Sequence, residues 1–93
     1  MTNYQIGVRC ERLWMAQMSR KGYTVERSAG SHGPVDCFAW NKDEVIFAQI
    51  KNGRNAYHNK DIVKLHEMER PKWVKVYLVV RVGGKVEWDW IEC

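Results

Sequence analysis

The sequence predicts an α/β fold in which a central mixed β-sheet is flanked by helices, in the order α-β-β-β-α-β-β. Three observations predict this fold. The chain begins with a segment of helical periodicity, continues with short apolar runs of strand character, and places a second helical segment between the third and fourth runs. Because parallel strands need a long crossover connection, that second helix is the natural link between two strands of one sheet.

The first helix is predicted over Asn3–Arg20. Thr2 or Asn3 can serve as its N-cap, and Gly22 follows its end, where glycine is favoured. An apolar stripe at i, i+3/i+4 and i+7 spacing marks its inward face. The stripe consists of Ile6, Cys10, Leu13, Trp14 and Gln17. This helix should therefore pack one face on the sheet.

The next three elements are predicted strands. They cover Tyr23–Arg27, Asp36–Asn41 and Val45–Lys51, and the last two form a hairpin around Lys42-Asp43-Glu44. Residues 28–34 and 52–59 are rich in glycine, serine, asparagine and other turn-forming types, so both are predicted loops.

The last part of the chain predicts one helix and two strands. The helix covers Asp61–Arg70 and ends before Pro71, which cannot continue it. A valine-rich strand over Trp73–Val82 follows, then a two-residue turn at Gly83-Gly84 and a strand over Lys85–Ile91.

Composition places the chain among globular proteins. Its 93 residues suit one domain (1–93), and 45% hydrophobic residues with five tryptophans exclude a disordered chain. No run is long enough to span a bilayer, and the first 21 residues carry charges where a signal peptide needs an apolar stretch. We therefore expect a cytoplasmic protein without a membrane partner.

Charge and cysteine content narrow the function further. A net charge of +4, from 15 basic and 11 acidic residues, is consistent with a polyanionic partner. The three cysteines have no CxxC spacing, which predicts free thiols rather than a disulfide framework or a zinc ribbon.

Three polar residues of the predicted hairpin raise a catalytic hypothesis. Gln49 and Lys51 project to one face of their strand, and Asp36 lies at the far end of the partner strand. A two-residue turn pairs Asp36 with Gln49, whereas a four-residue turn pairs it with Lys51. Either register places all three on one face, within roughly 5–8 Å. A three-residue loop without a bulge would place Asp36 opposite Ile50 and break the cluster.

The donor atoms of this cluster suit a hard divalent cation. Asp36 offers a carboxylate, Gln49 an amide oxygen and Ile50 a backbone carbonyl, which are ligands that Mg²⁺ accepts. Lys51 would be a nearby cation that stabilises a phosphate and orients the attacking water. We expect Mg²⁺ as the cofactor, with Mn²⁺ as a substitute.

Several segments of the chain carry a family resemblance. They are Gly7–Arg12, Gly22–Val25, Arg27–Ser31, Asp36 and Gln49–Lys51. Together they resemble the PD-(D/E)xK nuclease superfamily and, more narrowly, the archaeal-type (Hjc-like) Holliday junction resolvases, which viruses and phages also carry. The resemblance covers nearly the whole chain and implies a restriction-endonuclease-like core. If the protein is viral, we expect it to act in the cytoplasm of the host.

The resemblance implies a role for each matching residue. Glu11 would be a carboxylate that binds the metal or a metal-bound water, and Asp36 the principal ligand. Gln49 stands where the family usually has a second acidic ligand. Lys51 would be the catalytic lysine, and Ser31 a loop hydroxyl that helps to place the phosphate or the water.

Basic residues complete the resemblance. Arg12 and Arg27 would contact DNA near the cleavage site, and Arg9, Arg54 and Lys60 could extend that phosphate-binding surface. A homodimer would grip a branched, four-way DNA junction and nick two opposed strands.

Two features depart from the family pattern. Pro34-Val35-Asp36 has one residue more than the motif of the superfamily name, and Gln49 removes one negative charge from the site. The leading hypothesis is a Mg²⁺-dependent resolvase. The alternatives are a stand-alone nuclease of the virus-type replication-repair (VRR-NUC) branch, where QxK is at home and flaps or branched DNA are cut, and a catalytically inactive DNA-binding module.

Overall fold

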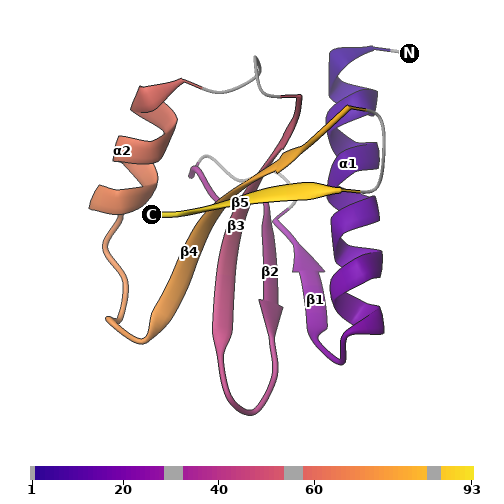
Figure 1. The fold of residues 1–93 in the computed structure, drawn as a ribbon. Coiled ribbons are helices and arrows are strands. Elements are labelled where there is room, and N and C mark those ends of the chain that lie inside the picture. The colour runs from indigo at the N-terminus through magenta and orange to yellow at the C-terminus, as the bar shows by residue number, and fades with distance from the viewer. Residues whose placement is uncertain (1, 29–32, 54–57, 84–86) are drawn as a thin grey trace.

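The computed structural model describes residues 2–28, 33–53, 58–83 and 87–93. Within these residues, one five-stranded sheet lies between two helices (Figure 1). The elements are α1 (Asn3–Arg20), β1 (Thr24–Arg27), β2 (Cys37–Trp40), β3 (Val45–Asn52), α2 (Asn59–Glu67), β4 (Val74–Arg81) and β5 (Trp88–Glu92). The predicted fold class and element order are confirmed. In the described part of the chain, no helix is both long and apolar enough to cross a membrane.

The sheet is mixed and its strands follow the order of the chain, β1-β2-β3-β4-β5. β1, β2 and β3 pair antiparallel, β3 and β4 pair parallel, and β5 returns antiparallel to β4. The one parallel pair is the pair that α2 connects, which confirms α2 as the predicted crossover.

Helix α1 has the predicted bounds because its first turn is capped by its own side chains. The Thr2 hydroxyl accepts a hydrogen bond from the Gln5 N–H (3.1 Å), and the Gln5 side-chain oxygen accepts one from the Thr2 N–H (2.8 Å). This reciprocal capping box satisfies two N–H groups that the helix itself leaves without partners. Gly22, with φ of 96°, takes the chain out of the helix.

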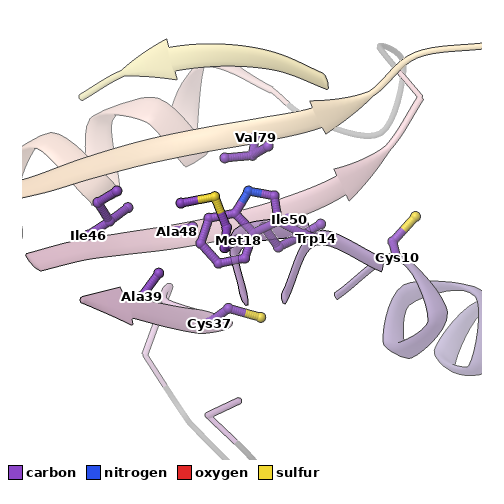
Figure 2. Close-up of a cluster of buried hydrophobic side chains, with 9 residues drawn as sticks. All are labelled: Cys10, Trp14, Met18, Cys37, Ala39, Ile46, Ala48, Ile50 and Val79. Carbon is purple, nitrogen blue, oxygen red and sulfur yellow. The ribbon is translucent and has the colours of Figure 1, made fainter. Parts of the chain in front are cut away.

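One face of α1 packs on the sheet and forms the larger part of the core. The buried side chains of this cluster, shown in Figure 2, come from α1, β2, β3 and β4. They are Cys10, Trp14, Met18, Cys37, Ala39, Ile46, Ala48, Ile50 and Val79. Trp14 is fully buried, and its ring centroid lies 5.8 Å from that of Trp90 on β5. Leu13 was predicted to face inward, but it lines the outer side of the helix, and the inward stripe continues through Met18 instead.

The opposite face of the sheet carries a second, smaller core under α2. Leu65 of α2 is fully buried against β4, together with Val76, Leu78 and Val80. Because Val79 belongs to the cluster on the α1 side, β4 is buried on both faces. A strand covered on both faces reads as a continuous apolar run, which explains its valine-rich sequence.

The boundaries of α2 differ from the prediction for a local reason. The Asp61 carboxylate accepts a hydrogen bond from the His58 N–H (2.7 Å), so the helix begins at Asn59, two residues earlier than expected. It ends at Glu67 rather than Arg70. The Arg70 guanidinium donates to the carbonyl oxygens of Leu65 (3.2 Å) and Cys93 (3.0 Å), which ties the end of the helix to the end of the chain.

Candidate active site

The polar residues of interest gather where β2 begins and β3 ends, beside the N-terminal half of α1 (Figure 1). Cys37 pairs with Ala48 across the hairpin, so Asp36, one residue earlier, stands beside Gln49, one residue later. This is the register of a two-residue turn, one of the two that the sequence left open. The Asn41 side-chain oxygen closes the turn by accepting hydrogen bonds from the N–H groups of Asp43 (2.8 Å) and Glu44 (2.9 Å).

The Asp36 carboxylate occupies the end of the β2–β3 ladder. Its Oδ2 accepts a hydrogen bond from the Ile50 N–H (2.9 Å), while the Asp36 N–H donates to the Ala48 carbonyl (2.9 Å). A backbone N–H lies close to the plane of the sheet, so this carboxylate lies at the sheet edge. Because the N–H and C=O of a strand residue point to the same side, the Ile50 carbonyl is directed toward the same edge.

Glu11 faces this edge from α1. Its Oε2 lies 3.5 Å from the Arg27 Nε, and its side chain is only 12% exposed. Burial and then the charge of Asp36 raise the pKa of Glu11, whereas Arg27 lowers it by less. Two carboxylates in each other's field, one of them raising the pKa of the other, form a place where a cation would be stabilised.

The pKa of Asp36 is also raised, and burial is the main cause. The hydrogen bond from the Ile50 N–H and the positive charges of Lys51 and Arg27 act in the opposite direction. Lys51 also lowers the pKa of Asp61 on α2, so its ammonium acts electrostatically on both Asp36 and Asp61. The cation predicted to assist at the site therefore acts electrostatically on Asp36.

A cleft of about 430 Å³ contains Glu11, Arg27 and Asp36. Its lining residues are Asn3, Tyr4, Gly7, Val8, Glu11, Arg27, Ser28, Asp36 and Ile50. Gly7 is inside α1, where glycine costs helix stability, and a Cβ built there would meet no atom within 4 Å. Neither packing nor a positive φ requires glycine at this position, so the space without a side chain belongs to the cleft.

Gln49 and Lys51 adjoin the cleft but do not line it. Lys51 lines a neighbouring cavity with Asn3, Gly7 and Ile50. The Gln49 side-chain oxygen is buried and, within the described part of the chain, accepts no hydrogen bond. A buried acceptor without a partner costs about 1–3 kcal/mol, so this oxygen has room for a partner such as an ordered water or an ion.

The available donors fit a hard divalent cation with few carboxylates. Among the described residues, no three histidine, cysteine or acidic side chains gather around one point. The groups that face one another are two carboxylates (Glu11 and Asp36) at the backbone of Ile50, and Gln49 stands beside Asp36 in the hairpin register. Oxygen donors of this kind suit Mg²⁺ better than zinc. Burial also raises the pKa of the nearby Cys37 thiol to about 12, so Cys37 does not offer a thiolate.

The other predicted residues lie in different places. Arg9 and Arg12 are exposed on the outer side of α1, and Lys60 is exposed in the first turn of α2. Ser31 and Arg54 lie outside the described residues. All three cysteines are free, as expected.

Tyr4 is a cleft residue that the sequence analysis missed. Tyr4, Gly7 and Glu11 follow i, i+3, i+7 spacing and so share one side of α1. A hydrogen bond with the Tyr4 side chain is the main reason that the pKa of Arg27 is raised. The helical spacing from Glu11 was a signal that could have pointed to this tyrosine.

Comparisons with known proteins bear on the family and the fold. Residues 2–93 match the family model described as archaeal Holliday junction resolvase (Hjc). The chain is 35% identical over 86 residues to crossover junction endodeoxyribonuclease Hjc of Methanocaldococcus jannaschii, an alignment that covers 89% of this chain. This chain spans only 64% of that relative's length. The solved structure of Archaeoglobus fulgidus Hjc, a Holliday junction resolvase, superposes with a TM-score of 0.71 over 90% of this chain and 73% of that one, at 21% identity.

Proposed function

The chain belongs to the archaeal Holliday junction resolvase (Hjc) family, and we propose that it is itself a Mg²⁺-dependent endonuclease that resolves four-way DNA junctions. It would act as one nuclease domain and nick two opposed strands as a homodimer. The observation that carries the proposal is the meeting of Glu11 and Asp36 at the Ile50 backbone in one cleft. The relative from M. jannaschii is named a crossover junction endodeoxyribonuclease, which supports the same activity here.

The cation-binding residues would be Asp36, Gln49, the Ile50 carbonyl and Glu11. Asp36 is held in place by the Ile50 N–H and Glu11 by Arg27, so both carboxylates are positioned before a ligand arrives. When bound, the cation supplies Lewis-acid stabilisation of the phosphate charge and favours an ionised attacking water. Mn²⁺ would substitute for Mg²⁺, since both accept oxygen ligands.

Lys51 provides the second positive charge of the proposed site. Its ammonium acts electrostatically on Asp36, and it lines the cavity next to the cleft. In this position it would attract the scissile phosphate and orient the attacking water. A preorganised charge of this kind acts without rearrangement when the phosphate develops negative charge.

The DNA backbone would be held by basic residues around the cleft. Arg27 lines the cleft itself, Arg9 and Arg12 follow on α1, and Lys60 begins α2. Arg54 is proposed from the sequence alone. Contacts of this type neutralise phosphates and release counterions, so junction binding should weaken steeply with salt.

A homodimer would bring two such sites to one junction. On the sheet face away from α1, the rings of Phe38 on β2 and Phe47 on β3 pack edge to face, with their centroids 5.2 Å apart. Trp40, also on β2, is 36% exposed. Exposed aromatic residues are enriched in protein interfaces, so we place a contact between protomers there. The cytoplasmic location expected from the sequence remains a prediction.

Gln49 supports a second candidate function. It removes a carboxylate where the family usually has one, which favours a DNA-binding module without catalysis. A third possibility is a nuclease of the VRR-NUC type that acts on flaps. Comparing flap and four-way junction substrates distinguishes it from a resolvase.

The test is cleavage of a labelled mobile four-way junction, a flap and a plain duplex, with and without Mg²⁺. The proposal predicts paired symmetric nicks in the junction only with Mg²⁺, and loss of cleavage but not of junction binding in Asp36→Ala and Lys51→Ala. Preferred flap cutting would indicate the VRR-NUC activity. Tight binding without cleavage at any Mg²⁺ or Mn²⁺ concentration would contradict the nuclease and support the binding module.

A further inference from the structure

A second groove runs along the outer side of α1, next to the cleft. Its volume is about 670 Å³. Its lining residues are Tyr4, Gln5, Val8, Arg9, Arg12 and Leu13. They form two neighbouring rows with i+4 spacing, 4-8-12 and 5-9-13, so the groove follows the helix axis. With a rise of 1.5 Å per residue, the rows are about 12 Å long.

The groove is continuous with the candidate active site. Tyr4 and Val8 line both the groove and the cleft that contains Glu11 and Asp36. The Tyr4 side chain stands at this junction and is 73% exposed. A molecule that enters the cleft with its phosphate beside Asp36 can therefore extend into the groove across the ring of Tyr4.

The chemistry of the groove suits one strand of a nucleic acid. Arg9 and Arg12 are exposed cations, and no lining residue is acidic. Tyr4 and Val8 precede Arg12 in one row and Leu13 follows Arg9 in the other, so an aromatic ring and apolar side chains line the same groove as the two cations. Cations for phosphates next to an aromatic face for bases are the combination that binds single-stranded nucleic acid.

An exposed ring can stack only on a base whose own face is free. In a continuous duplex, each base is covered by its neighbours, whereas a branch point offers bases that have lost a stacking partner. The groove is long enough for about three nucleotides at the rise of about 3.4 Å per nucleotide of one strand. This length suits the few nucleotides of one strand at a branch point better than a long duplex arm.

We propose that this groove holds the branch-point nucleotides next to the scissile phosphate, with one base stacked on Tyr4 through its free face and the adjoining phosphates on Arg9 and Arg12. The inference rests on the proposed nuclease function and adds to it a base-binding subsite. Tyr4 would select branched DNA, because only a branch supplies a free base within reach of the cleft.

The experiment is a binding cycle carried out without Mg²⁺, so that it does not depend on cleavage. Four-way junctions are prepared either intact or with abasic nucleotides at the branch point, and affinities are measured for the wild type, Tyr4→Ala and Tyr4→Phe. Tyr4→Ala should bind the intact junction about tenfold more weakly than the wild type does. On the abasic junction, Tyr4→Ala and the wild type should have equal affinity. Tyr4→Phe should retain the affinity, because the ring and not the hydroxyl stacks. Trp73→Ala is the matched control, since Trp73 is 67% exposed but lies between α2 and β4.

The outcomes separate the two proposals. Equal affinity of Tyr4→Ala and wild type for the intact junction would overturn the base-binding subsite. So would an equal loss on intact and abasic junctions, since the ring would then contact something other than a base. A shift of Tyr4→Ala from dimer to monomer with unchanged DNA affinity would make the groove a self-association surface and likewise overturn it. Binding that follows the cycle without any cleavage in Mg²⁺ would contradict only the nuclease, and absence of junction binding would contradict both.

Discussion

Two groups, each made of one glutamate, one basic residue and one tyrosine, lie at opposite ends of the sheet, and the pKa values of their glutamates shift in opposite directions. The active-site group consists of Glu11, Arg27 and Tyr4, and the distal group consists of Glu44, Lys75 and Tyr23. In the distal group, the Tyr23 hydroxyl donates to Glu44, and the Lys75 ammonium lies 3.0 Å from the same carboxylate. These contacts lower the pKa of Glu44, whereas burial and Asp36 raise that of Glu11.

The difference shows what each end of the sheet contributes. Glu44 has both a hydroxyl and an ammonium partner, so its group joins the α1–β1 connection, the β2–β3 turn and β4. Glu11 is largely buried beside a second carboxylate, and the Gln49 oxygen has no hydrogen-bond partner in the described structure. Carboxylates with raised pKa values in a cleft are typical of functional sites, because stability alone would favour their removal.

The largest expected effect comes from neutralising Asp36. Asp36→Asn keeps an oxygen that can accept from the Ile50 N–H, but it removes the charge that the proposed cation needs. We expect junction cleavage to fall about a thousandfold. The melting temperature in EDTA should stay the same or rise, since a partly buried charge is removed. A large drop in melting temperature together with activity would show that Asp36 acts mainly in folding.

A smaller effect should follow from restoring the acidic ligand. Gln49→Glu adds a carboxylate to the site, so affinity for Mn²⁺ should increase about tenfold, and cleavage should be preserved or improved. Without metal the variant should be less stable than the wild type, because three carboxylates would then repel one another. Titration calorimetry with Mn²⁺ and thermal unfolding in EDTA measure both effects. Complete loss of activity would show that the amide itself is required.

The pH dependence of stability should distinguish the two groups. Because the pKa of Glu11 is raised in the folded state, the folded protein holds this proton more tightly than the unfolded chain does. Glu11 therefore reduces stability increasingly as pH rises above its ordinary value of 4.5. In EDTA, Glu11→Gln should raise the melting temperature at about pH 7, and the gain should shrink toward about pH 4. A constant difference across this range would contradict the raised pKa.

The smallest effect is expected in the distal group. Glu44→Gln removes the charge on which Tyr23 and Lys75 converge, so the melting temperature should fall by a few degrees near neutral pH. The pKa of Glu44 is lowered, so its contribution is present above pH 4.5 and is lost as pH falls through the folded value. Junction cleavage should equal that of the wild type, and a clear loss would show that the two ends are coupled.

Much of this comparison could be read from the sequence, but not all of it. Periodicity and turn residues predicted α1 to the residue, because its caps are local. The hairpin register stayed open, since Asn41–Glu44 lacks a strongly typed turn, and the choice depends on hydrogen bonds of the Asn41 side chain. Leu13 was assigned to the wrong side of α1, because a stripe built on Leu13 and one built on Met18 are both compatible with helical spacing.

The distal group could not be predicted, and neither could the state of Gln49. Tyr23, Glu44 and Lys75 are separated by more than 20 residues, so only tertiary folding brings them together. Sequence spacing predicted that Asp36 would lie opposite either Gln49 or Lys51, depending on the turn. It contained no information on the burial of the Gln49 oxygen or on its missing partner.

The proposed nuclease function depends on a cation site formed by Asp36, Gln49 and the Ile50 carbonyl, with Glu11 beside it. Crystals soaked in Mn²⁺ would test it through the anomalous scattering of the metal. We predict one strong peak about 2.0–2.4 Å from a carboxylate oxygen of Asp36, the side-chain oxygen of Gln49 and the carbonyl oxygen of Ile50. Full Mn²⁺ occupancy elsewhere, with none at these three oxygens, would contradict it.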